Sequence, residues 1–266
     1  MAAKVLDRSA GTVPAALLTA VIERFDPIAV ILFGSRARGD AGPDSDWDLL
    51  VVVDDEDFAT RPRRVPQHGW PVETSIVALP RSRFEAERDV IGTMANMADE
   101  DGQVVWRRGD AATPGHRGRR IVDEAERWQA ARRWLRNAER DLRMARLALA
   151  AEPDLVEPAA FHLQQAAEKT LKGLLAAHAV AFRKSHRLGE LAARLVAVRP
   201  ELAPDVEGLD PYTRWVGAGR YDDADTDVPI TRGNVELLLG RCAPLLTRAR
   251  ALDPTRGGGT TGDRQP

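Results

Sequence analysis

Hydrophobic and polar residues follow different patterns in the two halves of the chain. In the first half, short apolar runs rich in β-branched residues alternate with longer mixed segments. Apolar runs of this length, bounded by turn residues, predict buried strands. We expect strands at Ile28–Phe33, at Leu49–Val53, around Val72 and at Gln103–Trp106, with helices at Pro14–Arg24 and Arg81–Asp99. Alternating strands and helices predict an α/β domain.

In the second half the strand pattern disappears. Apolar residues recur there at the i, i+3, i+4, i+7 spacing of amphipathic helices. We expect helices at Ile121–Ala151, Pro158–Val180, Ser185–Val196 (with Ser185 as the cap), Pro204–Val216 and Arg232–Ala251. Helices joined by short connections predict an antiparallel bundle. The expected fold class is therefore α+β, an α/β domain followed by an all-α bundle.

The composition of the connecting segments suggests domain boundaries. Gly109–Gly118 is rich in Gly, Pro and small polar residues, which is typical of a linker. We place the α/β domain at 1–108, the linker at 109–120, the helical domain at 121–252 and a disordered tail at 253–266.

Charge and cysteine content narrow the function classes. The net charge is −2 and the pI is about 6.2, so no global basic field recruits nucleic acid. The single cysteine, Cys242, excludes an internal disulfide and a multi-cysteine metal site. No apolar run is long enough to span a membrane. These features predict a cytoplasmic protein.

A group of candidate catalytic and binding residues lies between the first two predicted strands. The chain reads Gly34-Ser35, then ten residues, then Asp46-Trp47-Asp48. Side chains alternate along a strand, so Asp46 and Asp48 share one face and Trp47 points to the other. Paired carboxylates are ligands that magnesium prefers, and magnesium usually keeps substrate phosphates in its shell.

The residues around the Gly-Ser pair suit a phosphate group. Gly34 allows close approach of the backbone, and Ser35 with the following N–H groups can donate to phosphate oxygens. Arg36 and Arg38 add positive charge near the same anion.

This motif resembles that of the nucleotidyltransferase family, whose domains have the polymerase-beta-like α/β fold. In that family a third carboxylate lies on a later strand, and Glu73 in Val72–Val77 occupies that position, although the family more often has Asp there. The resemblance implies a nucleoside triphosphate substrate, bound by Gly34, Ser35, Arg36 and Arg38. It also implies Mg²⁺, or Mn²⁺, held by Asp46, Asp48 and Glu73.

The second half resembles the HEPN family. The resemblance rests on Ala160–Leu175, which contains Gln-Gln-Ala-Ala-Glu-Lys, on Ser185-His186-Arg-Leu188 and on Arg220-Tyr221-Asp222. HEPN domains are helical bundles, commonly dimeric, and are often encoded beside minimal nucleotidyltransferases as toxin–antitoxin pairs. The resemblance therefore implies a fusion of the two, with a homodimer contact through the helical domain.

One departure from that family bears on activity. Its ribonuclease members carry Arg, four to six residues, then His near the end of the bundle, whereas no histidine follows Arg220. The acid/base group that RNA cleavage would need is missing there. Arg220 and Tyr221 remain candidates for the functional edge of the domain, with Tyr221 as a possible nucleotide acceptor. Whether nucleic acid is a partner stays open.

The sequence predicts a magnesium-dependent transfer of a nucleoside monophosphate to a hydroxyl of a protein or a small molecule. Two alternatives remain. One is an antibiotic nucleotidyltransferase of the aminoglycoside type, and the other is a non-catalytic nucleotide-binding regulatory dimer. The polar stripe Gln164, Gln165, Glu168 and Lys169 fits either a groove lining or a solvated face.

Overall fold

The computed structural model describes residues 13–43, 45–60, 69–109, 120–151, 155–182, 185–217 and 227–254. The chain divides into two compact units, Met1–Val122 and Asp123–Pro266, and each is described by itself. The division falls near the end of the predicted linker, most of which lies outside the described residues.

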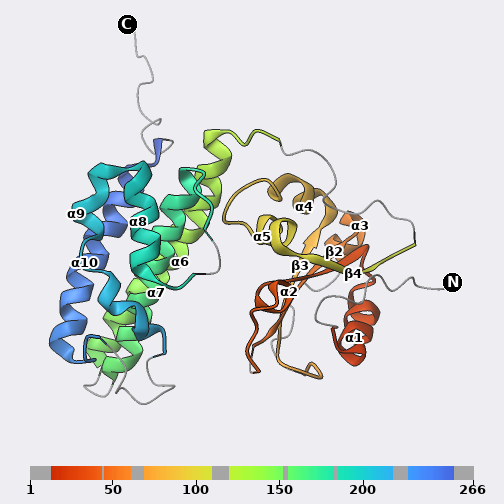
Figure 1. Cartoon of the computed structure of the whole chain (residues 1–266), viewed down its shortest axis with the longest axis horizontal. Helices are drawn as coiled ribbons and strands as arrows, with labels where there is room; N and C mark the ends of the chain where they lie inside the picture. Colours follow the sequence, from red (N-terminus) through yellow and green to blue (C-terminus); the bar gives the residue numbers. More distant parts are fainter. Residues whose placement is uncertain are drawn as a thin grey trace, which may run out of the picture. The chain divides into compact units, whose positions relative to one another are not determined.

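The first unit contains a four-stranded mixed sheet with helices on both faces (Figure 1). The strand order is β3-β2-β1-β4. Strand β1 runs antiparallel to both β2 and β4, and β2 runs parallel to β3. The elements in chain order are α1 (Ala15–Phe25), β1 (Ala29–Phe33), α2 (Ser35–Arg38), β2 (Trp47–Val53), α3 (Asp55–Thr60), β3 (Thr74–Pro80), α4 (Arg81–Glu87), α5 (Met94–Asp101) and β4 (Gln103–Arg107).

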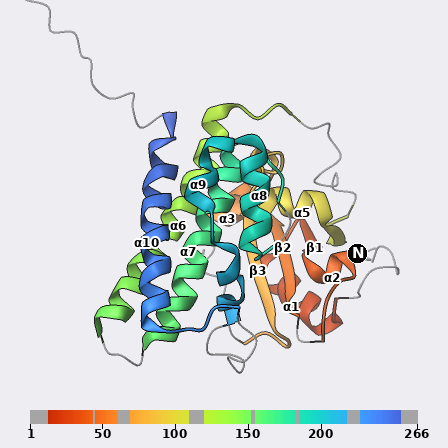
Figure 2. The same ribbon diagram turned by 60° about the vertical axis from the view of Figure 1, so that its left-hand side comes forward.

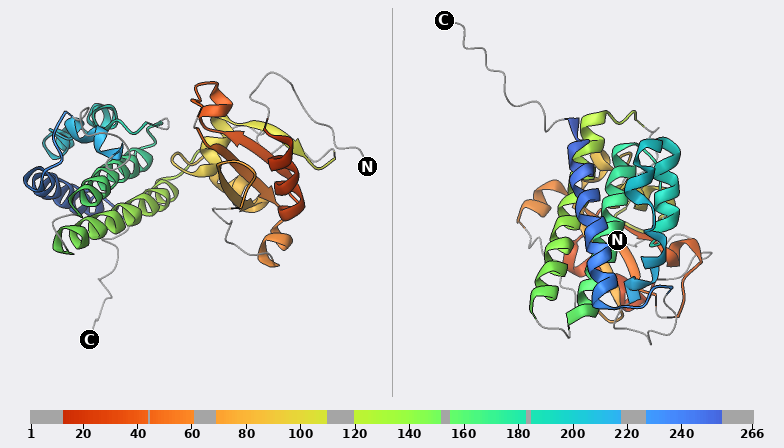
Figure 3. Two further views of the ribbon diagram at one scale, coloured as in Figure 1. Left: turned by 90° about the horizontal axis from the view of Figure 1, so that it is seen from below. Right: turned by 90° about the vertical axis from the view of Figure 1, so that its left-hand side faces the viewer.

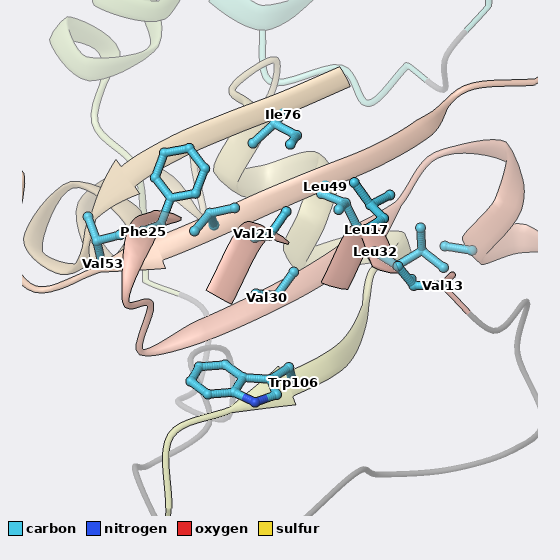
Figure 4. Packing of buried hydrophobic residues seen from close by; sticks show 12 residues of the cluster. Val13, Leu17, Val21, Phe25, Val30, Leu32, Leu49, Val53, Ile76 and Trp106 are labelled. Carbon is cyan, nitrogen blue, oxygen red and sulfur yellow. The ribbon is translucent and has the colours of Figure 1, made fainter. Parts of the chain in front are cut away.

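Alternation along the strands builds one core on each face of the sheet. Leu49, Val51 and Val53 of β2 pack with the buried side of α1, as Figure 4 shows for Leu17, Val21 and Phe25. Leu50 and Val52 point the other way and pack with Phe84 of α4 and Ala95 of α5. Because both faces are covered, the strands read as continuous apolar runs.

The predicted helix Arg81–Asp99 is wrong in its interior, since the segment forms two helices. Gly92 has a positive φ of 83°, a conformation that favours glycine and ends helical geometry. Thr93 then caps α5 by accepting a hydrogen bond from the Asn96 backbone N–H at 3.0 Å. The Asn96 side chain donates to the carbonyl of Arg88, which ties the two helices together.

The second unit is all helical, as Figures 2 and 3 show. Its long helix α7 packs against α6, α8 and α10. The elements are α6 (Glu124–Ala151), α7 (Val156–Ala177), α8 (Leu188–Val198), the 3₁₀ turn η2 (Pro200–Leu202), α9 (Ala203–Val206), the 3₁₀ helix η3 (Asp210–Gly217) and α10 (Arg232–Ala251). The expected α+β class, with an α/β domain before a helical bundle, is confirmed.

Three details of the helical half differ from the sequence prediction. The expected helix Pro204–Val216 is α9 and η3, separated at Gly208, whose φ is 72°. Helix α8 starts at Leu188, whose N–H donates to the Thr213 hydroxyl of η3 and not to Ser185, and the Ser185 side chain contacts Glu190. The expected disorder from residue 253 is wrong at its first position, because the buried Asp253 accepts two hydrogen bonds from Arg132. Residues 255–266 lie outside the described part.

Candidate active site

The first candidate site lies at one end of the β1–β2 ladder. Phe33, the last residue of β1, pairs with Asp48 of β2. The Gly34-Ser35 turn follows Phe33 directly, and Asp46 precedes Asp48 by two residues, so both segments lie at this end of the ladder. The Gly-Ser turn and the carboxylate pair therefore meet at the same edge of the sheet.

Asp48 sits on the sheet face expected from alternation. Trp47 packs into the core on the α1 side, so Asp48 belongs to the opposite face, with Leu50 and Val52. Asp48 is 7% exposed, whereas Asp46 precedes the first residue of β2 and is exposed. One carboxylate is thus anchored in the fold and the other reaches into solvent.

Gly34 is required by backbone geometry. Its φ of 80° and ψ of −156° lie in a region that essentially only glycine occupies. Helix α2 starts directly after it, and the first N–H groups of a helix have no partner within the helix. On β4, the Gln103 side chain donates to the Ala37 carbonyl at 2.7 Å and holds the end of α2.

Arg36 has a different role from the one expected. Its Nε and Nη2 atoms donate to the Ser45 carbonyl at 2.9 and 2.5 Å. The guanidinium carbon also lies 4.4 Å from the ring centroid of Trp47. Arg36 therefore holds the peptide immediately before Asp46. The structure gives it a positioning role that depends on contacts nine residues away, which no local sequence signal shows.

Arg38 is likewise engaged with the protein. It forms a two-pronged pair with Asp40, with both N–O distances at 3.2 Å, and its Nη1 lies 3.7 Å from Asp101. Its side chain is 22% exposed. Binding of phosphate by Arg38 would thus compete with two carboxylates.

Glu73 lies on the adjacent strand edge. Strand β3 runs parallel to β2 with Asp48 opposite Ser75, and the Trp47 N–H donates to the Glu73 carbonyl at 3.1 Å. Glu73 and Asp46 each precede by one residue the first pair of this ladder, Thr74 and Trp47. Glu73 precedes the first residue of β3 and is exposed.

The donor chemistry of this edge suits a hard divalent cation, which prefers carboxylate oxygens. The described residues nevertheless include no group of three His, Cys, Asp or Glu side chains gathered as they would be around a metal ion. The fold brings the segment Asp46–Asp48 to the end of the β1–β2 ladder, and the joint participation of Asp46, Asp48 and Glu73 stays a prediction.

The polar stripe of the helical unit proves to be largely internal. Gln164 and Glu168 on α7 are buried, so the solvated-face interpretation is wrong for them. The Glu168 carboxylate accepts hydrogen bonds from Lys172 Nζ at 2.8 Å and from Gln164 Nε2 at 3.1 Å, and lies 3.0 Å from His186 Nδ1. Only the Glu-Lys pair at i, i+4 signals this cluster in the sequence.

The charge state of Glu168 follows from these contacts. Burial by itself would raise the pKa of its carboxyl group. The hydrogen bond with His186 and the charge of Lys172 outweigh burial and lower the pKa to about 2. Glu168 is therefore an ionised internal carboxylate, and the His186 side chain, 54% exposed, joins the start of α8 to α7.

The expected HEPN edge, Arg220 and Tyr221, lies outside the described residues. The other tyrosine, Tyr212, is buried and makes an edge contact with the ring of Trp215. Cys242 is buried in the bundle, and burial raises the pKa of its thiol to about 12. This thiol is therefore inert at neutral pH.

Comparison with protein families agrees with this division of the chain. Residues 15–91 match the family described as "Nucleotidyltransferase domain", and residues 131–251 match the "HEPN domain". The chain thus joins a nucleotidyltransferase domain to a HEPN domain, in that order. It is accordingly a nucleotidyltransferase, and domains of this kind generally use divalent metal ions.

Among solved structures, the chain is similar to a nucleotidyltransferase-like protein from Exiguobacterium sibiricum 255-15. The two share 14% sequence identity over 88% of this chain and 74% of the other, with a TM-score of 0.42. This score is too low to support a statement about the site. No curated protein matches the chain. Within the described residues, no helix is long and apolar enough to cross a membrane.

Proposed function

We propose that the protein transfers a nucleoside monophosphate from a nucleoside triphosphate to an acceptor hydroxyl. The acceptor oxygen bonds to the α-phosphorus, the bond between the α- and β-phosphates breaks, and pyrophosphate leaves. One observation carries the proposal: the fold brings Gly34-Ser35 and the pair Asp46 and Asp48 to one edge of the sheet.

The residues of this edge would divide the work. Asp46, Asp48 and Glu73 would hold Mg²⁺ or Mn²⁺, which neutralises phosphate charge when bound. Gly34 and Ser35 would bind the triphosphate. Arg38 would contribute after its ion pairs with Asp40 and Asp101 break. Arg36 would keep the peptide before Asp46 in place. Glu73 could also accept the proton of the acceptor hydroxyl.

The test uses the full chain with labelled nucleoside triphosphates, magnesium and a cell lysate. We expect pyrophosphate release and label on an acceptor. Both should disappear in the variant Asp46→Asn with Asp48→Asn while the circular dichroism spectrum is unchanged. Undiminished release by the folded double variant would refute the site. The size of the labelled product distinguishes a protein acceptor from a small molecule such as an antibiotic.

The wider setting is part of the same proposal. We place the protein in the cytoplasm, as a homodimer through the helical domain, and relate it to toxin–antitoxin systems. Light scattering of the full chain should give twice the monomer mass. Tyr221 is a candidate acceptor within the chain, and intact-mass measurement of wild type and Tyr221→Phe after incubation with each triphosphate tests it. Nucleotide binding without any transfer would favour a regulatory dimer instead.

A further inference from the structure

A basic groove runs between two helices of the second unit and has no part in the proposed reaction. Helices α6 and α10 lie side by side and antiparallel, because Arg250 pairs with Glu139 and Arg232 reaches the carbonyl of Leu149. The groove has a volume of about 900 Å³ and also borders Asp205 of α9. Figure 2 shows α10 alongside α6.

Positive charge dominates this α6–α10 groove. Among the described residues, five arginines and two carboxylates, Glu139 and Asp205, line it. Arg250 is already paired with Glu139, with Nη1 to Oε1 at 2.7 Å. No ion pair within the described part of the chain involves Arg143, Arg146 or Arg248, and all three are exposed. The five arginines that line the groove are Arg140, Arg143, Arg146, Arg248 and Arg250.

The groove also has an apolar component that continues beyond it. Leu142 and Leu246 lie at its base, together with the exposed Pro244. On α6, Met144 and Leu147 are about half exposed, and each follows an arginine of the groove, Arg140 or Arg143, at i, i+4 spacing. On α10, Leu237 is also about half exposed. It lies seven residues before Pro244 and eleven before Arg248, so the three share one side of the helix. A partner that complements this side of the bundle must therefore present apolar and acidic side chains together.

A second copy of this chain does not satisfy that requirement. A two-fold contact on this face would set the same patch against itself, so arginines would oppose arginines. Like charges placed opposite each other in an interface cost several kcal/mol. A phosphodiester backbone would satisfy the arginines but offers nothing to cover Met144, Leu147 or Leu237. The described residues that line the groove include no aromatic side chain to stack on a base.

We propose that the α6–α10 groove binds an acidic amphipathic helix of a partner protein. The apolar side of that helix covers Met144 and Leu147 and its carboxylates pair with Arg143, Arg146 and Arg248. This is recognition of a helix in a groove combined with recognition of an acidic motif by arginines. It also implies that any homodimer uses another face of the bundle.

The test measures fluorescence anisotropy of a labelled peptide of about 15 residues, enough for a helix, with Leu at i, i+3, i+4 and i+7 and Glu on the flanks. The full chain should bind it with a Kd on the order of tens of micromolar. The variant Arg143→Glu with Arg146→Glu should weaken binding at least about tenfold. A matched peptide with Lys in place of Glu should not bind.

The control variant, Arg81→Glu with Arg187→Glu, makes the same charge change at exposed positions outside the groove and should bind as wild type does. The neutral variant Arg143→Gln with Arg146→Gln serves if the reversal disturbs folding. Equal weakening by the control, or no binding of the acidic peptide at about 1 mM, would overturn the proposal. So would displacement of the peptide by single-stranded RNA of about 20 nucleotides that binds more tightly, since this identifies a nucleic-acid site.

Discussion

Asp46 and Glu73 in the first unit are exposed carboxylates at a strand edge, whereas Glu168 in the second is 3% exposed and touches three polar side chains. The internal partners of Glu168 compensate its charge within the fold. An exposed carboxylate at the end of a strand is accessible to a ligand from solution, such as a metal ion. The difference that matters is therefore the set of internal partners, and Glu168 has three of them, all within the helical unit.

The largest expected effect is on catalysis, from the exposed member of the pair. Asp46→Asn keeps the shape of the side chain and removes its charge, so transfer should fall at least about 100-fold, as for other groups that stabilise transition-state charge. The free energy of unfolding should change by less than about 0.5 kcal/mol, because the residue is exposed. Steady-state pyrophosphate release and urea unfolding measure the two quantities.

The control for Asp46→Asn is Glu56→Gln, an exposed acidic residue of α3 that should leave both quantities unchanged. A loss of stability in Asp46→Asn as large as its loss of activity would place Asp46 among the structural carboxylates and remove the distinction between the two units.

The reverse result is expected in the helical unit. Glu168→Gln leaves the buried Lys172 without its carboxylate partner, which should cost about 3 kcal/mol of unfolding free energy. The double variant Glu168→Gln with Lys172→Met should regain part of this loss, since no buried charge is left unpaired. Thermal or urea unfolding measures both. Pyrophosphate release per folded molecule should stay near the wild-type value.

The stability of the protein at low pH should also depend on Glu168. The folded pKa of Glu168, about 2, is below its ordinary value of 4.5. Stabilisation from this group is therefore fully present above about pH 4.5 and is lost as the pH falls toward 2. Wild type should lose stability through this window by about 3 kcal/mol more than Glu168→Gln does. Parallel curves of unfolding free energy against pH for the two proteins would contradict the assignment.

The sequence was sufficient for what depends on neighbours along the chain. Alternation along β2 predicted that Trp47 and Asp48 lie on opposite faces, and the Gly-Ser turn followed from local residue types. The break between α4 and α5 was missed because one glycine and one threonine cap outweigh a continuous helical pattern. The buried cluster around Glu168 was missed because it depends on His186, eighteen residues away.

A smaller effect on nucleotide binding is expected from a change in the Gly34-Ser35 turn. Gly34→Ala adds a Cβ where φ is 80° and ψ is −156°, which should cost about 2 kcal/mol of strain. Release of this strain would move the start of α2, so the KM for the triphosphate should rise about tenfold or more. The matched control is Gly39→Ala, also at positive φ but with open space around its Cβ position. Equal kinetics of the two variants would count against a phosphate role for Gly34.

The smallest effect separates two roles for one arginine. If Arg36 mainly supplied charge to the triphosphate, Arg36→Lys would retain much of its function and Arg36→Met would raise KM. The structure instead shows two guanidinium donors on the Ser45 carbonyl while the same planar group lies over the ring of Trp47, and the compact ammonium of lysine cannot make both contacts at once. We therefore expect Lys and Met to be alike, with kcat lowered about five- to tenfold, about 1 kcal/mol, and the KM for the triphosphate little changed. A KM that rises in Arg36→Met and is restored in Arg36→Lys would return Arg36 to the phosphate-binding group.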